Sequence, residues 1–134
     1  MDKIRYNEEQ EAFEIDYELW GKKVTVLFYM EEQQEIIENI SEIADKLGKL
    51  DRNKSKIAEV IKRDGCYDKK KFPLITIAEL EAQMKIESAF VDMDEDGVVL
   101  GATVVTKNGA LGEGVMVEVL GDGALEVSAE GKLL

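Results

Sequence analysis

The sequence contains no histidine and a single cysteine among its 134 residues. Histidine is the commonest general base near neutral pH and a frequent zinc ligand, so Ser-His-Asp and Cys-His catalysis are excluded within this chain. Cys66 alone can form neither an internal disulfide nor a cysteine-rich zinc site, which agrees with a reducing compartment. The sequence also lacks an apolar run near the roughly 20 residues that span a bilayer, and the segment MDKIRYNEEQ lacks the apolar core of a signal peptide. We therefore expect a soluble cytoplasmic protein without a cofactor.

The composition is that of an ordinary globular protein with a strongly acidic balance. Hydrophobic residues make up 45% of the chain and charged residues 34%, and the net charge is −12. The length predicts a single domain, residues 1–134. An acidic surface disfavours nucleic acid and anionic membranes and favours either a basic protein partner or simple solubility. Residues 51–72 are the exception, because they carry eight Lys or Arg residues against four Asp or Glu residues.

The N-terminal third alternates between apolar and polar residues. In EAFEIDYELW, the apolar residues from Phe13 to Leu19 occupy every second position. A period of two indicates a strand with one face in water. Gly21 and Lys22 form a turn signal, and KVTVLFYM predicts a second strand. We expect an antiparallel hairpin.

The middle of the chain has helical periodicity. Apolar residues recur at helical spacing between Ile36 and Leu47, and Gly48 is a suitable C-terminal stop. A second helix is expected from about residue 51 or 53 to residue 64. A third, short helix begins at Thr76, which with Glu79 has the spacing of a capping box.

From Ile86 onward the period is again two. Four β-rich segments are separated by Asp96-Gly97, Asn108-Gly109 and Asp122-Gly123, which favour tight hairpin turns. This spacing predicts a four-stranded antiparallel meander. The predicted fold is therefore α+β, with an N-terminal β-hairpin, three helices on one face of the sheet and the C-terminal meander. The sequence leaves open whether the hairpin joins that sheet.

The segment DMDEDG resembles the start of a calcium-binding loop. Asp92, Asp94 and Asp96 stand where an EF-hand loop has its first three ligands, and a glycine follows. The twelfth position is Thr103, which cannot supply the bidentate carboxylate that such a loop requires. Because the flanking segments are strands, we interpret the segment as a hairpin turn and predict no metal site.

Four residues are candidates for binding another protein. Tyr17, Trp20 and Tyr29 add exposed aromatic surface if they lie on the outer side of the alternating N-terminal strands. Glu113, in the glycine-rich segment GALGEG, is the fourth candidate. That segment lacks the lysine and the following helix of a phosphate-binding loop, so its glycines indicate a bulge or a close strand approach.

Residues 57–131 resemble a bacterial family that is known only as domain-of-unknown-function family 2262. The similarity rests on LGEGVMVEV, on the following GDGALEVSAEG and on the helix IAEVIKRDGCYDK. Glu113 stands where the family tends to have histidine, so any role of that histidine is lost or altered here. The resemblance implies an α+β fold and, loosely, a toxin-neutralising immunity partner or a small accessory binding domain.

The absence of a catalytic motif and the acidic charge together predict a non-catalytic protein-binding domain, with a basic protein as its partner. One alternative is a divalent-metal sensor or a metal-dependent enzyme that uses Asp92, Asp94 and Asp96. Another is a self-associating structural module, a homo-oligomer in which the basic segment 51–72 meets the acidic ends of a neighbouring copy.

Overall fold

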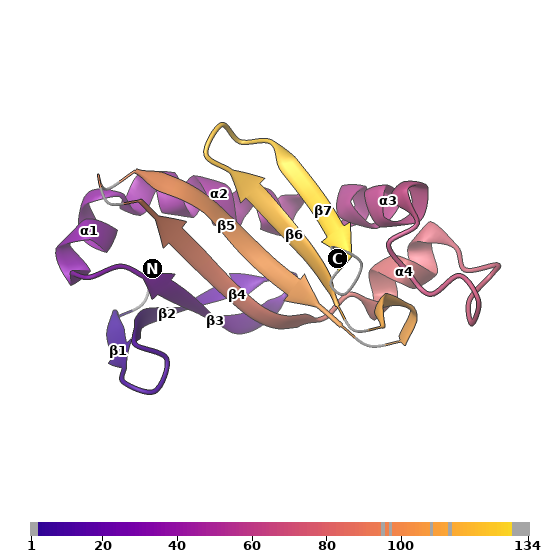
Figure 1. The fold of residues 1–134 in the computed structure, drawn as a ribbon, viewed down its shortest axis with the longest axis horizontal. Coiled ribbons are helices and arrows are strands. Elements are labelled where there is room, and N and C mark those ends of the chain that lie inside the picture. The colour runs from indigo at the N-terminus through magenta and orange to yellow at the C-terminus, as the bar shows by residue number, and fades with distance from the viewer. Residues whose placement is uncertain (1–2, 95, 97, 108, 113, 130–134) are drawn as a thin grey trace.

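The computed structural model describes residues 3–94, 96, 98–107, 109–112 and 114–129. These residues form an α+β fold in which one mixed sheet carries the helices on one face (Figure 1). Within the described residues the sheet has seven strands, which lie side by side in chain order. The strands are β1 (Arg5–Asn7), β2 (Ala12–Leu19), β3 (Lys22–Tyr29), β4 (Ile86–Met93), β5 (Val99–Thr106), β6 (Val115–Leu120) and β7 (Leu125–Ala129). The helices are α1 (Gln33–Glu38), α2 (Ile40–Arg52), α3 (Lys54–Asp64), α4 (Ile77–Gln83) and the 3₁₀ helix η1 (Gly109–Leu111).

The α+β class is as predicted, but the predicted architecture is wrong. The N-terminal hairpin and the C-terminal strands belong to one sheet, because β3 pairs with β4 in parallel. In that pairing Val26 lies opposite Ala89, and Phe28 lies opposite Val91. A parallel pair needs a long crossover connection, and helices α1 to α4 supply it. The other neighbouring strands pair antiparallel.

Strand β1 was not predicted, because three residues are too few to show an alternating pattern. It pairs with the start of β2. The guanidinium of Arg5 donates to Glu14 Oε1 at 3.1 Å and to Asp16 Oδ1 at 2.9 Å, and these contacts hold the short strand against its neighbour.

The first predicted helix is two helices, and it does not end at Gly48. The break lies at Asn39, which has φ −111° and ψ 17° and donates from Nδ2 to the carbonyl of Glu35 at 2.8 Å. Helix α2 then continues through the buried Gly48 to Arg52. The structure therefore has four α-helices in its described residues, where the sequence pattern predicts three.

Two predicted helix boundaries are confirmed. Helix α3 ends at Gly65, whose φ of 69° is the left-handed conformation that glycine adopts without steric cost. Helix α4 begins directly after its N-cap Thr76, and the predicted capping box is present. Thr76 Oγ1 accepts from the backbone N–H of Glu79, and Glu79 Oε1 accepts from the backbone N–H of Thr76, both at 3.1 Å.

The predicted turn at Asn108-Gly109 is not a tight hairpin turn. The chain between β5 and β6 passes through η1, and Gly112 (φ 57°) follows that helix. Asn108 lies outside the described residues, as does Gly97 of the first predicted turn. The turn between β6 and β7 is tight, because the backbone N–H of Gly123 donates to the carbonyl of Leu120 at 2.9 Å.

The core lies between the helices and the inner face of the sheet. Helix α2 contacts β2, β5 and β6, while α3 contacts β7 and α4. The largest fully buried side chains are Phe28, Ile15, Leu19, Ile36, Ile43, Leu47, Leu50, Ile57, Ile61 and Leu80. Because side chains alternate along a strand, the outer face of the sheet carries the other set of residues. Figure 1 is viewed toward that outer face, with α2 behind the sheet and α3 beside the end of β7.

Candidate functional site

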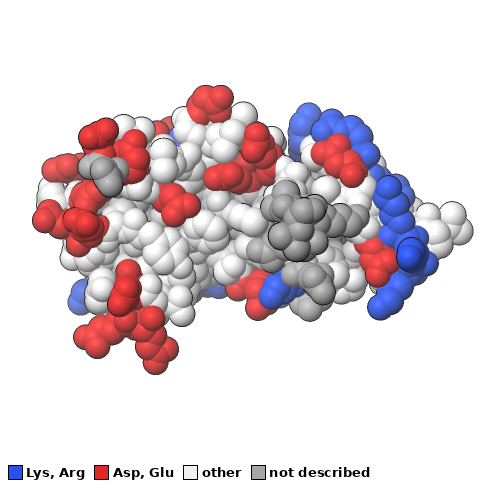
Figure 2. All heavy atoms as spheres, in the orientation of Figure 1, with Lys and Arg blue, Asp and Glu red and all other residues white. Residues whose placement is uncertain are grey.

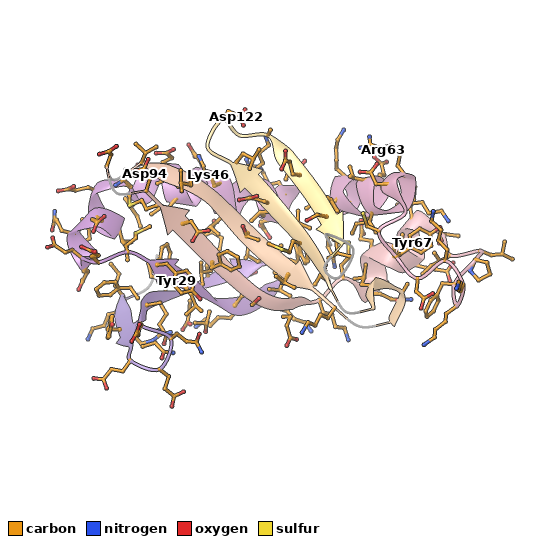
Figure 3. The ribbon with its side chains drawn as sticks, viewed as in Figure 1. Tyr29, Lys46, Arg63, Tyr67, Asp94 and Asp122 are labelled. Atoms are coloured by element: carbon orange, nitrogen blue, oxygen red, sulfur yellow. The ribbon has the colours of Figure 1, made fainter. Side chains whose placement is uncertain are left out.

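Charge is separated along the length of the molecule. Figure 2 shows acidic side chains gathered over the end that holds α1 and basic side chains gathered toward the opposite end, around α3 and α4. The basic end corresponds to residues 51–72, which hold eight of the 17 Lys and Arg residues of the chain. Tyr29 and Asp94 lie at the acidic end, and Arg63 and Tyr67 lie at the basic end (Figure 3).

Two adjoining hollows mark the acidic end, and together we call them the acidic groove. One encloses about 460 Å³ and the other about 440 Å³. They share Tyr29, Met30 and Glu31, so they form one continuous depression. The remaining lining residues are Tyr6, Glu11, Glu32, Glu35, Met93 and Asp94. The lining thus combines carboxylates, two tyrosines and two methionines, and it includes no lysine or arginine among the described residues.

The two tyrosines of the acidic groove are exposed but fixed in place. The side chain of Tyr29 is 44% exposed, and its ring meets that of Phe90 edge to face at a centroid distance of 6.0 Å. Tyr6 is 55% exposed, and its ring meets that of Phe13 edge to face at 5.1 Å. Each ring therefore contacts a neighbouring aromatic ring and still exposes about half of its residue's surface to solvent. Rigid exposed aromatic rings of this kind are typical of protein-binding surfaces.

The carboxylates of the acidic groove fall into two groups. Asp94 and Glu35 are held by backbone groups: Asp94 Oδ1 accepts from the N–H of Asp96 and of Val98, both at 2.9 Å, and Glu35 Oε1 accepts from the N–H of Glu32 at 3.1 Å. These bonds shape the walls of the groove. The other group, Glu11, Glu31 and Glu32, is exposed to solvent. These carboxylates are available to a cationic ligand.

The methionines come together only because of the parallel strand pair. Met30 follows β3 and Met93 ends β4, and the register places Tyr29 opposite Asp92. Met30 is 8% exposed and Met93 is half-buried, and both line the groove. Methionine adapts its shape to a bound side chain and is frequent at binding surfaces.

Carboxylates also line up on the outer face of the sheet beside the acidic groove. Glu118 lies opposite Thr103 on β5 and opposite Glu126 on β7. Partial burial raises the pKa of Glu118, and the negative charges of Glu126 and Asp92 raise it further. Partial burial also raises the pKa of Asp92. The outer face therefore holds negative charge that water does not fully stabilise.

Replacing Glu118 by glutamine tests this electrostatic cost. A raised pKa means that the folded protein binds this proton more tightly than the unfolded chain, so ionisation removes stability as the pH rises above the ordinary value of 4.5. We expect E118Q to be more stable than the parent at pH 7 by up to about 0.5 kcal/mol, since the side chain still contacts water. The difference should vanish well below pH 4.5. Urea unfolding at pH 7 and well below pH 4.5 measures the difference, with E59Q, at an exposed position of α3, as the control. An equal gain in stability at low pH would contradict the electrostatic explanation.

The aspartates of the DMDEDG segment do not converge on one point. Asp92 is on the outer face of β4, whereas Asp94 and Asp96 belong to the turn. Among the described residues, no three histidine, cysteine or carboxylate side chains are grouped closely enough to hold a metal ion. Glu95 and Gly97 lie outside the described residues.

The structure does not bring the three described protein-binding candidates together. Tyr29 lies in the acidic groove, and Tyr17 is half-buried and packs against the core. Trp20 is in the turn between β2 and β3, at the other end of β3 from Tyr29. Glu113 lies outside the described residues.

Sequence reasoning missed Tyr6, Glu11, Met30, Glu31 and Met93. Tyr6 belongs to a strand too short to recognise, and Met93 approaches Met30 only through the parallel pairing. The one local signal was the segment MEEQQE, in which a methionine precedes a run of carboxylates at a strand end.

Comparison of this chain with protein-family models, curated proteins and solved structures finds no match. The similarity to family 2262 therefore stays a prediction. Among the described residues, none of the helices has the length and hydrophobicity that a membrane crossing requires.

Proposed function

We propose that this chain is a non-catalytic protein-binding domain whose acidic groove receives a basic segment of a partner protein. The observation that carries the proposal is the composition of the groove: two fixed, exposed tyrosines beside exposed carboxylates and methionines. An arginine or lysine side chain fits such a site, because its charge interacts with both the carboxylates and the tyrosine ring faces. The long-range field of a chain with net charge −12 also speeds the approach of a basic partner.

The groove suits binding better than catalysis. Its carboxylates are either held by backbone N–H groups or exposed, as Glu35 and Glu31 illustrate. Carboxylates held by the backbone give the groove a fixed shape, and exposed ones can pair with a cationic side chain. More specifically, we propose that this chain is a cytoplasmic bacterial protein of the immunity type, which neutralises a basic toxin.

A synthetic peptide with four arginines spaced by glycines tests the proposal. We expect it to bind with a dissociation constant of roughly 1–100 μM, while the same peptide with neutral citrulline in place of arginine does not bind. Replacing both tyrosines (Y6A with Y29A) should weaken binding about fivefold to thirtyfold, because each exposed cation–π contact is worth about 0.5–1 kcal/mol. Calorimetric titration measures both.

A matched pair of charge variants separates groove binding from general attraction. E11Q with E31Q removes two exposed carboxylates from the groove, and E59Q with E87Q removes two exposed carboxylates elsewhere. The first pair should weaken binding more than the second at every salt concentration. Equal losses would show that the peptide is attracted only by net charge, and the proposal would then be wrong. Light scattering on the chain alone would reveal self-association instead.

A further inference from the structure

A second hollow lies at the other end of β3 and has the opposite charge. It encloses about 450 Å³ between the β2–β3 turn, the start of α3 and the segment that leads from α4 into β4. Its distinctive lining residues are Trp20, Met84, Lys22, Lys23, Lys54 and Lys85, and we call it the lysine hollow. With about 3.3 Å per residue, the length of β3 separates it from the acidic groove by roughly 23 Å. The two sites are therefore independent.

The concentration of positive charge is unusual for this chain. Asp and Glu outnumber Lys and Arg by 29 to 17, yet the described lining of this hollow holds four lysines and no carboxylate. Glu18 lies opposite Lys23 in the β2–β3 register and offsets part of its charge. None of the four lysines forms an ion pair within the part of the chain that the structure describes. Their mutual repulsion is relieved if an anion binds among them.

Trp20 is held beside these lysines at a conformational cost. Its φ of 51° is left-handed, which costs a residue with a side chain about 1–2 kcal/mol. Its backbone N–H donates to Asp51 Oδ1 at 2.7 Å, and its indole Nε1–H donates to the carbonyl of Leu50 at 2.9 Å. The ammonium of Lys54 lies 5.6 Å from the ring centroid. The fold therefore places a flat apolar ring beside the ammonium group of a half-buried lysine.

The residue types in the hollow select the kind of anion. Lysine ammonium groups act as mobile point charges that suit phosphate, whereas planar carboxylate recognition favours the fork of arginine. The described lining contains no arginine. Its volume of about 450 Å³ is that of a small-molecule site, and Met84 and Trp20 add apolar surface for the body of a ligand. We propose that the lysine hollow binds a small phosphate-bearing molecule with at least two negative charges.

Pyrophosphate is a suitable probe, because the hollow contains its own reporters. Trp20 is the only tryptophan, so selectively excited tryptophan emission reports this site alone. We expect a saturable change in emission with a dissociation constant below about 1 mM, accompanied by movement of the Met84 methyl signal in NMR spectra. The methyl signals of Met30 and Met93, in the acidic groove, should stay in place.

Three lysine variants, two inside the lysine hollow and one outside it, give the comparison. K54Q with K85Q should weaken pyrophosphate binding at least tenfold. K22Q changes a single lysine at an exposed position and should weaken binding less. It provides a second test if the double variant folds poorly. K56Q changes an exposed lysine of α3 outside the hollow and should leave binding unchanged. An equal effect of K56Q, an equal response to sodium chloride at the same ionic strength, or equal affinity for citrate would overturn the assignment of a phosphate site.

Discussion

Replacing Phe28 by alanine is expected to destabilise the protein by about 3–5 kcal/mol. Phe28 has no exposed surface and is the largest of the fully buried side chains. It lies on β3 between Phe13 of β2 and Val91 of β4, at the parallel pair that joins the two halves of the sheet. Its loss would leave a cavity at the junction, which the surrounding strands cannot close without breaking their register. Urea unfolding measures the change.

The neighbouring Tyr29 is the matched control for this prediction. Its side chain points to the outer face and is 44% exposed, so Y29A should cost less than about 1 kcal/mol. If Y29A were as damaging as F28A, the assignment of the two faces of β3 would be wrong. In that case Y29A could not be used to test peptide binding, because the variant would be partly unfolded.

Replacing Gly101 by alanine is expected to destabilise the protein by about 1–3 kcal/mol, because its added methyl group has no space. A Cβ atom at this position of β5 would lie 2.9 Å from the backbone carbonyl oxygen of Val119 and 3.0 Å from Glu118 Oε2. The carboxylate can move aside, but the carbonyl oxygen belongs to β6 and can move only if the two strands separate. Thermal or urea unfolding measures the loss.

Gly121 provides the matched glycine. A Cβ atom there would meet its nearest neighbour, the carbonyl oxygen of Val99, at 3.4 Å, an ordinary contact. G121A should therefore be neutral or stabilising by up to about 1 kcal/mol, since alanine restricts the unfolded chain. Equal destabilisation by G101A and G121A would contradict the close approach of β5 and β6 at Gly101.

Local patterns in the sequence were enough to predict several elements of the fold. Alternation from Phe13 to Leu19 predicted β2 and its buried face, and the Thr76–Glu79 spacing predicted the start of α4. The parallel pairing of β3 with β4 could not be predicted in this way. An alternating pattern shows which side chains of a strand are buried, but it does not identify the neighbouring strand. Asn39 is itself a signal for the break between α1 and α2, since asparagine is common at helix ends. The helical spacing of apolar residues continues across this position, so the pattern predicts one helix.

The residues of the candidate site, too, could be predicted only where they belong to strands that the sequence pattern reveals. Tyr29 was predicted as a binding residue because it belongs to a recognisable strand. Its partners in the acidic groove, Tyr6 and Met93, reach it through β1 and through the parallel pair, neither of which the sequence pattern revealed. Trp20 was grouped with Tyr29 because both are aromatic and close in sequence, yet β3 separates them.

Binding of a basic segment in the acidic groove is tested most directly by methionine methyl NMR spectra of the full chain. The spectra are recorded while the four-arginine peptide is added. Met30 and Met93 line the acidic groove, Met116 lies beside the outer-face carboxylates, and Met84 lines the lysine hollow. If a basic segment binds in the groove, the signals of Met30 and Met93 should shift together and saturate, while those of Met84 and Met116 stay in place. Shifts centred on Met116, or small shifts spread evenly over all four, would contradict the groove as the binding site.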